Sequence, residues 1–437
     1  MTQTWPRALA WGLLVVLTSG CSAALVRPDE GECRGADVAT WAKRAAASLV
    51  TRPYRPAVIY DVDRRGLSTV FRAGPLDPDA RAVVSYPDVA RFPGQGPGFD
   101  RVQDRSFVYD DALVALWLTS RGDRDGARRI LSTLAALQRP DGAWGFSFQT
   151  GRDGFYNAGY VRAGTVAWVV YAFARYASKF NEMRWSSTID RGVAWLVRQH
   201  DPATGLVSAG LGRWVSSDVF DPDWVGSFAA TEHQLDIWFA FQAAQQADPA
   251  VASRWQLART AQGLVAAVDA FLWRADEGRY VQGIAGTRID EGSALDASGT
   301  WAALYDLAVG RNVRSDSALQ WVEAHHAIDV QGWAGLRPYE GLPPDTWFVE
   351  ASVAVPLALS RLGRRQQALE ALQPFADLAC AGGVPLVYSP VWATDFPFSP
   401  ATAPTVWFLF AAAEVVGGEA PFLWSERLNV PIGPAAR

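Results

Sequence analysis

Apolar residues recur along most of this chain at spacings of three and four, the period of a helix with one buried face. Twelve helices are predicted, over residues 36–51, 108–120, 125–138, 162–177, 187–200, 231–247, 250–275, 295–309, 315–328, 346–362, 364–380 and 402–416. The long stretch between the first two is rich in Pro, Gly and Asp. Within it, segments 58–60 and 68–71 are expected to pair as a β-hairpin.

The linkers between these helices alternate in length. Those after even-numbered helices are short, as at 121–124 and at Gly363, and those after odd-numbered helices are long, as at 139–161 and 201–230. Short linkers produce antiparallel helical hairpins. The six long linkers should therefore lie together at one end of the molecule, where functional residues concentrate.

The two sets of helices also differ in polarity. Even-numbered helices are apolar nearly all round, as in 164–173 and 405–412, whereas odd-numbered ones such as 127–137 are amphipathic. A helix that is apolar on every side is buried, and an amphipathic helix covers a core. The pattern therefore predicts an all-α fold with an inner ring and an outer ring of six helices each.

Several local segments accompany this alternation: Tyr109-Asp-Asp-Ala-Leu-Val-Ala-Leu116, Thr231-Glu-His-Gln-Leu-Asp236 and Trp347-Phe-Val-Glu-Ala351. With the alternation, they resemble the (α/α)6 toroid of the six-hairpin glycosidase superfamily. The resemblance implies one toroidal domain over 36–425, between a tether at 21–35 and a tail at 426–437, and an activity on carbohydrates. Relatives often carry Glu-Gly where this chain has Glu350-Ala351.

The chain opens with one basic residue, an apolar run over 8–17 and then Thr18-Ser-Gly-Cys21. This order is typical of a secretion signal, and the run is too short to span a membrane. The segment Thr18-Ser-Gly-Cys21 resembles a bacterial lipobox, which implies removal of residues 1–20 and a lipid on Cys21. The protein would then be exported and anchored to a bacterial membrane, on the periplasmic side or the cell surface. An ordinary signal peptide with a chance cysteine is the alternative.

Composition narrows the possible partners. The formal net charge is −5 and the basic residues are dispersed, which argues against nucleic acid. The 20 Trp residues suit a large core or the stacking of sugar rings. We expect a carbohydrate substrate, a monomer, and no membrane contact other than the lipid anchor.

Beyond Cys21, the chain contains only Cys33 and Cys380. Cys33 precedes the first outer helix and Cys380 ends the sixth. The first and last hairpins are neighbours in a closed ring, so we expect the two cysteines to be close. A disulfide and two free thiols both remain open. No Cys or His spacing suggests a metal site, and no cofactor is expected.

Acidic residues recur where the long linkers enter the inner helices: Asp110, Asp111, Glu232, Asp236, Asp296, Asp345, Glu350 and, in the last linker, Asp395. Glycoside hydrolysis requires two carboxyl groups, one of them protonated. Glu232 is the expected general acid, because Asp236 lies one turn away on the same face and should raise its pKa. Asp110 or Glu350 is expected to be the base. A solvated helix face is the alternative for Glu232 and Asp236, and Asp296 and Asp345 are expected to be helix caps.

Other residues of the long linkers and helix starts are expected to bind substrate: Asp111, Asp236, His233, Tyr160, Arg162, Trp144, Trp224, Trp347 and Trp392. The aromatic ones could instead pack the linkers against the body. Gln138-Arg-Pro-Asp-Gly-Ala-Trp144 also resembles the QW repeat of triterpene cyclases, but their acidic DxDD motif is absent. It is better interpreted as a lock at the end of an outer helix.

Two other functions remain open. A polysaccharide lyase on the same toroid could use Tyr160 or His233 as a base and Arg162 to neutralise a uronate. The acidic residues at the inner-helix ends argue against an anionic substrate. A glycan-binding lipoprotein without catalytic activity is the other alternative.

Overall fold

The computed structural model describes residues 33–54, 59–62, 68–71, 77–87, 102, 104–150, 156–215, 219–286, 288–330, 332–340, 346–388 and 399–428. The signal segment, Cys21, Asp345, Trp392 and Asp395 lie outside these ranges. Within the described ranges, no helix has both the length and the apolar character needed to cross a membrane.

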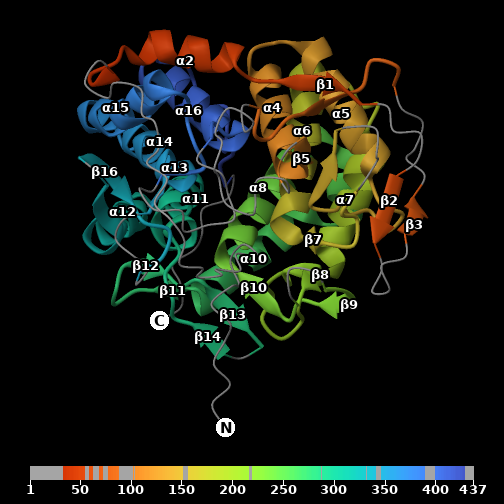
Figure 1. Cartoon of the computed structure of the whole chain (residues 1–437). Helices are drawn as coiled ribbons and strands as arrows, with labels where there is room; N and C mark the ends of the chain where they lie inside the picture. The colour runs from red at the N-terminus through yellow and green to blue at the C-terminus, as the bar shows by residue number, and fades with distance from the viewer. Residues whose placement is uncertain are drawn as a thin grey trace.

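Six helices form a closed inner ring. They are α4 (Val108–Ser120), α6 (Ala163–Phe180), α8 (Thr231–Ala247), α11 (Trp301–Ala308), α14 (Ala354–Arg361) and α16 (Thr402–Val415). Each packs against the next, and α16 returns to α4 (Figure 1). Nearly every residue of α4, α6, α8 and α16 is buried, as their apolar composition predicts.

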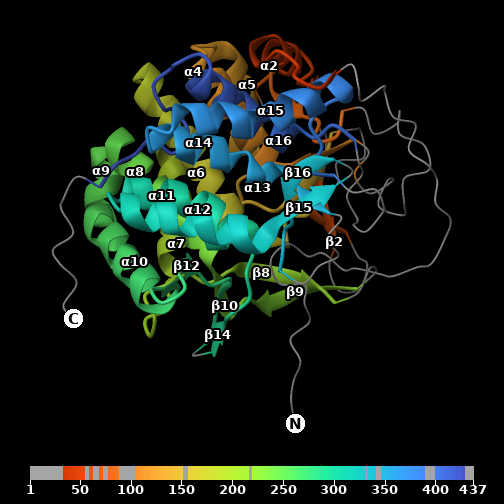
Figure 2. The same ribbon diagram turned by 90° about the vertical axis from the view of Figure 1, so that its left-hand side faces the viewer.

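The outer helices surround this ring. They are α2 (Val38–Ala47), α5 (Arg124–Leu137), α7 (Ser186–Arg198), α10 (Leu257–Phe271), α12 (Asn312–His326) and α15 (Arg365–Ala381). Each of α5, α7, α10, α12 and α15 packs on the inner helix that precedes or follows it, and α2 packs on α15 and α16 (Figure 2). The arrangement is the predicted (α/α)6 toroid of six helical hairpins.

Three predicted helices are broken in the structure. The span 250–275 is divided into α9 (Pro249–Arg254) and α10, because Gln256 adopts a left-handed conformation with φ 49°. The helix at 295–309 starts with a π-helical turn, η2 (Asp296–Thr300), before α11. Such turns occur often at functional sites.

The third break lies in the helix predicted at 346–362. Its first residues form the short strand β17 (Trp347–Phe348), followed by α13 (Val349–Ser352) and α14. Pro356 lacks the N–H that would bond the carbonyl of Ser352, four residues earlier. The helix is therefore interrupted between α13 and α14.

Short antiparallel strands occupy the linkers. The pairs are β1 (Thr51–Pro53) with β4 (Arg81–Val83), β2 (Ile59–Val62) with β3 (Ser68–Phe71), β5 (Arg105–Phe107) with β6 (Ser147–Gln149), β11 (Trp273–Arg274) with β12 (Arg279–Tyr280), β15 (Ala327–Val330) with β16 (Trp333–Leu336), and β17 with β18 (Val387–Tyr388). Two three-stranded sheets join β7 (Val161–Arg162), β8 (Gly210–Trp214) and β9 (Phe220–Val225), and β10 (Phe228–Ala230), β13 (Gly283–Ala285) and β14 (Arg288–Asp290). The β2–β3 pair is the predicted hairpin.

Four of these strands run directly into inner helices. β5 precedes α4, β7 precedes α6, β10 precedes α8 and β17 precedes α13, with no intervening residue. Each strand is paired with a second strand from a different part of the chain. The sheets therefore fix the N-terminal ends of the inner helices, where the acidic residues lie.

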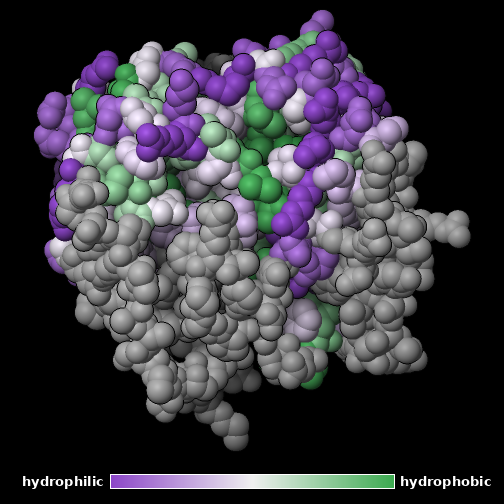
Figure 3. All heavy atoms as spheres, turned by 45° about the horizontal axis from the view of Figure 1, so that its top comes forward, coloured by the Kyte–Doolittle hydropathy of each residue, from purple (hydrophilic) through white to green (hydrophobic). Residues whose placement is uncertain are grey.

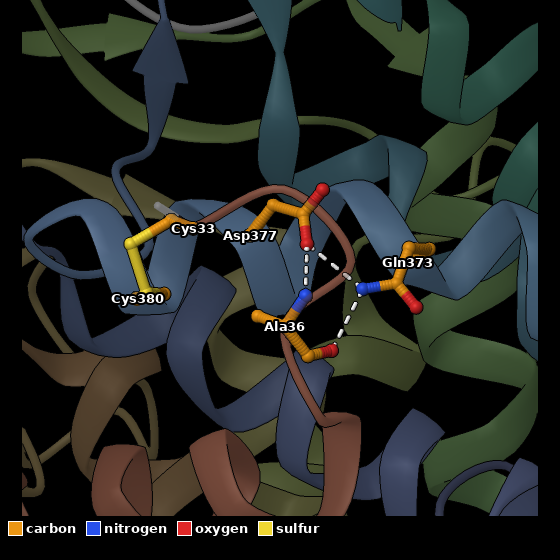
Figure 4. Close-up of a disulfide and its surroundings, with 5 residues drawn as sticks. All are labelled: Cys33, Ala36, Gln373, Asp377 and Cys380. Carbon is orange, nitrogen blue, oxygen red and sulfur yellow. Dashed lines mark hydrogen bonds between the residues drawn. A yellow bond between two sulfur atoms is a disulfide. The ribbon is translucent and has the colours of Figure 1, made fainter. Parts of the chain in front are cut away.

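A disulfide joins Cys33 and Cys380, whose Cα atoms lie 5.6 Å apart. Close to it, the backbone N–H of Ala36 donates to Asp377 on α15, and Gln373 donates to the Ala36 carbonyl (Figure 4). These contacts tie the start of the first hairpin to the last outer helix. The predicted closeness of the two cysteines is therefore a consequence of ring closure.

Where the described residues show on the face turned forward in Figure 3, the upper rim is mainly hydrophilic and a narrower hydrophobic strip runs between its two sides. This is the usual polarity of a solvent-facing surface, on which apolar residues are interspersed with charged ones.

The described C-terminal segment after α16 packs against the body of the toroid, including the first three residues of the expected tail at 426–437. Arg175 and Tyr171 of α6 bond the buried carboxylate of Glu426, and the N–H of Leu428 donates to the Ala308 carbonyl. The neighbouring Trp424 is only 1% exposed and enters the centre of the ring. The folded body therefore extends to at least Leu428.

Candidate functional site

Five carboxyl groups lie together at the N-terminal ends of the inner helices. Asp110 comes from α4, Glu232 and Asp236 from α8, Asp296 from η2 and Glu350 from α13; each is at most 6% exposed. Glu232, Asp236 and Glu350 each have their pKa raised partly by charges of other members. Helices that are remote in sequence therefore bring these acids into one site.

Three other carboxyl groups lie near Glu232. Burial is the main cause that raises its pKa well above the ordinary value, and the charges of Asp296, Asp236 and Glu350 add to the shift. Its carboxyl also hydrogen-bonds that of Asp296. Two carboxyl groups can share such a bond only if one of them holds a proton. Burial and these acidic neighbours therefore favour the protonated form of Glu232.

Asp236 lies one helical turn below Glu232. Burial, followed by the charges of Asp296 and Glu350, raises its pKa well above the ordinary value, while the indole N–H of Trp168 donates to the carboxyl and opposes that rise. A side chain at Gly164 would place its Cβ 2.6 Å from the Oδ2 atom of Asp236. Glycine at this position allows α6 to approach α8 at the site.

Burial also raises the pKa values of Glu350 and Asp110. Burial raises the pKa of Glu350 to about 8, and a hydrogen bond from Tyr109 opposes the rise. Burial raises that of Asp110 to about 7, opposed by a bond from the Ser85 hydroxyl. Glu350 Oε1 has no hydrogen-bond partner among the described residues. This buried oxygen is available to a substrate or to water.

His233 and Arg162 lie beside this cluster. His233 Nε2 lies 3.4 Å from Glu232 Oε1, and burial, with the charge of Arg162, lowers the pKa of the imidazole to about 3. The imidazole is therefore neutral. Arg162 donates to the carbonyls of Leu211 and Gly212, and its guanidinium lies 3.8 Å from the ring centre of Tyr160.

Three of the expected substrate-binding residues are structural instead. Asp111 accepts the N–H of Val83 and the hydroxyl of Ser106, so it holds β4 and β5 against α4. Trp144 is completely buried and donates to the Leu134 carbonyl.

Trp347, the third, is 1% exposed and donates to the hydroxyl of Ser352. Neither indole can stack on a sugar, because other protein groups already cover both of its faces. The lock expected near Trp144 is present, since Gln138 donates to the carbonyls of Gly142 and Thr188 and thereby joins α5 to α7.

Trp224 is half-buried and lies beside two guanidinium groups. The centre of its ring lies 5.5 Å from the Cζ atom of Arg162 and 5.7 Å from the Cζ atom of Arg213. It therefore remains a candidate for contact with substrate. Trp392 lies outside the described residues.

The sequence reasoning missed four residues of the site. Asp296, expected to be a cap, lies inside the carboxyl cluster. Tyr109 and Trp168 donate to carboxyls of the cluster, and half-buried Tyr339 lies near Asp296 and Glu232, whose charges help burial to raise its pKa. Asp296 could have been found from its position, which on its own inner helix matches that of Glu232.

The described residues contain no group of three or more His, Cys, Asp or Glu side chains arranged to hold a metal ion. Within the cluster, Glu232 and Asp296 are hydrogen-bonded, and burial and mutual charge raise the pKa values of Glu232, Asp236 and Glu350.

No protein-family model matches the chain, and no curated protein matches it in sequence. Solved structures do. A D-mannose isomerase shares 12% identity over 79% of this chain and 93% of its own, with a TM-score of 0.57. A glycosidase shares 15% over 77% and 91%, with a TM-score of 0.53.

A bacterial glucoamylase complexed with acarbose shares 14% identity over 75% of this chain and 50% of its own, with a TM-score of 0.53. At these identities the similarity establishes the fold and nothing finer. The chain has the (α/α)6 toroid fold that these glycosidases and this isomerase also have.

Proposed function

We propose that this protein is a glycoside hydrolase that cleaves an oligo- or polysaccharide by carboxyl acid/base catalysis. The observation that carries the proposal is that buried Glu232, whose raised pKa favours the protonated form, shares one site with Glu350, whose Oε1 atom has no partner among the described residues. Glycosidases require one protonated and one ionised carboxyl at such a site. The fold shared with a glycosidase and a glucoamylase supports it.

In the proposed reaction Glu232 donates its proton to the glycosidic oxygen as the bond from that oxygen to the anomeric carbon breaks. Ionised Glu350 removes a proton from the water that adds to this carbon, or attacks the carbon itself before water releases the sugar. Asp296, hydrogen-bonded to Glu232, supplies a carboxyl through which the acid can be reprotonated. Asp110 is the alternative base, because its pKa, at about 7, also permits ionisation.

The remaining polar groups suit a neutral sugar. Asp236 Oδ1 and His233 Nδ1 are buried and have no hydrogen-bond partner among the described residues, so each can bond a substrate hydroxyl. The guanidinium of Arg162 already bonds main-chain carbonyls. Among the described residues, an anionic sugar would therefore meet several acids and an Arg162 that is already bonded, and this disfavours the lyase reaction.

The test is a panel of purified glycans and aryl glycosides incubated with the mature protein. Hydrolysis releases new reducing ends, and Glu232→Gln should lower the rate at least about 10²-fold. Conversion of an aldose to a ketose without new reducing ends would indicate an isomerase instead. A new ultraviolet absorbance would indicate a lyase, and binding without product a glycan-binding protein.

We also propose that the protein is exported, lipidated at Cys21 and monomeric. The proposal rests on the order of basic, apolar and small residues before that cysteine. A radiolabelled fatty acid should label the wild-type protein in a bacterial host and the membrane fraction should contain it. Cys21→Ser should remove the label, and light scattering should give the mass of one chain. Labelling of Cys21→Ser would contradict lipidation at Cys21, and the mass of a dimer would contradict the monomer.

A further inference from the structure

The C-terminal segment places an aromatic ring at the centre of the toroid. Trp424 stacks on Phe239 of α8 at 4.6 Å between ring centres and on Trp168 of α6 at 5.1 Å. It meets Trp301 of α11 and Trp407 of α16 edge-on, at 5.6 and 5.5 Å. Four of the six inner helices thus contact a residue that follows the last of them.

Two of these contacted indoles hold carboxyl groups of the site. The N–H of Trp168 donates to Asp236. The N–H of Trp407 donates to the hydroxyl of Tyr109 at 2.8 Å, and Tyr109 in turn bonds Glu350. Both hydrogen bonds favour the ionised carboxylate. The aromatic layer is therefore the support on which two of the five acids rest.

Trp424 itself is fixed from the opposite end of the ring. Its backbone N–H donates to the hydroxyl of Tyr171 at 2.8 Å, and Arg361 donates to its carbonyl at 2.9 Å. The same Tyr171 hydroxyl donates to buried Glu426. Trp424 has φ 49°, a conformation that a bulky residue keeps only where its surroundings hold it.

From these contacts we infer that Trp424 is a positioning residue: the C-terminal segment closes the toroid and holds Trp168 and Trp407 where they orient Asp236 and Glu350. This role rests on the proposed function of the carboxyl cluster. Removal of the Trp424 ring leaves an empty volume beside both indoles, into which they can move. Each carboxyl then loses the donor that stabilises its charged form.

The test compares Trp424→Ala with Trp424→Phe and with a matched control in the same segment. Phe422→Ala removes a ring that stacks on Phe410. Phe422 makes no described ring contact with Trp168, Trp301 or Trp407, the tryptophans that Trp424 contacts. Trp424→Ala should lower kcat roughly ten- to hundredfold, as expected when catalytic groups are misplaced. It should also move the acidic limb of the pH profile to higher pH, because the carboxylates lose their donors.

Trp424→Phe keeps a ring against Phe239 and should retain most of the activity, and Phe422→Ala should change the melting temperature without moving the pH profile. If Trp424→Ala does not fold, Trp424→Leu makes the same comparison, since it retains apolar volume without the ring. Wild-type kcat and pH profile in the folded variant would overturn the inference.

A second measurement does not depend on catalysis. The indole N–H resonance of Trp168, assigned with Trp168→Phe, should shift as Asp236 titrates in the wild type and should lose that shift in Trp424→Ala. An unchanged titration would overturn the positioning role. Wild-type protein without activity on any glycan, but with the expected change in resonance, would refute only the proposed function.

Discussion

Glu350→Gln should stabilise the protein as the pH rises, although it removes the proposed base. Glu350 is 1% exposed, and burial raises its pKa from 4.5 to about 8. A carboxyl with a raised folded pKa favours the folded state while it is neutral. Its contribution is complete below pH 4.5 and is lost as the pH rises to about 8. Glutamine is neutral throughout and can still accept the Tyr109 hydrogen bond.

The magnitude follows from the size of the shift. Each pH unit between the unfolded and folded pKa values costs the wild type about 1.4 kcal/mol relative to the variant. The stability difference between Glu350→Gln and wild type should therefore grow by about 3 kcal/mol between pH 5 and pH 7.5. For a chain of this length this corresponds to roughly 3 °C in melting temperature.

The assay is calorimetric melting of both proteins across that pH range. Glu323→Gln on α12 is the matched control, because Glu323 is exposed and its variant should melt like the wild type at each pH. A constant difference between Glu350→Gln and wild type from pH 5 to pH 7.5 would refute the reasoning. It would mean that Glu350 is solvated or already paired when ionised.

Three further predictions follow from the same contacts. Because burial raises the pKa of both candidate bases, to about 7 and about 8, the acidic limb of kcat/KM should lie near neutral pH; a limb near pH 4 would contradict this. Gly164→Ala should abolish activity and destabilise the fold, since its Cβ would overlap Asp236, whereas Gly263→Ala, which meets nothing within 4 Å, should stabilise α10 by up to about 1 kcal/mol in denaturant titrations. Cys33→Ser with Cys380→Ser should lose roughly 3–5 kcal/mol of stability but keep kcat, because the disulfide lies on the outer ring; loss of activity at a temperature where the variant is folded would contradict it.

The apolar pattern predicted the two rings, because a helix that is apolar on every side must be buried and an amphipathic helix must cover it. Apolar spacing alone did not predict that an inner helix is divided into α13 and α14. The presence of Pro356, which has no backbone N–H, is the separate sequence signal for that break. Nor did apolar spacing predict that Gln256 adopts a left-handed conformation. Both breaks occur within segments whose apolar spacing stays helical on either side.

Site residues were harder to predict than helices, because burial depends on contacts between distant segments. Trp144 and Trp347 lie in or beside long linkers, as substrate-binding aromatics often do, yet packing covers both rings. Asp296 looked like a helix cap, and only ring closure places it beside Glu232. Trp424 follows the last helix, so nothing in its local sequence suggested that it fills the centre of the toroid.

The central claim is that Glu232 is the proton donor. Its most direct test compares Glu232→Gln with wild type on two substrates of the same sugar: the glycan that the wild type cleaves, and an aryl glycoside with a dinitrophenolate leaving group. A leaving group of low pKa departs without a proton, whereas a sugar hydroxyl does not. We predict a loss of at least about 10²-fold on the glycan and little loss on the aryl glycoside. Equal losses on both, or none on the glycan, would contradict the assignment.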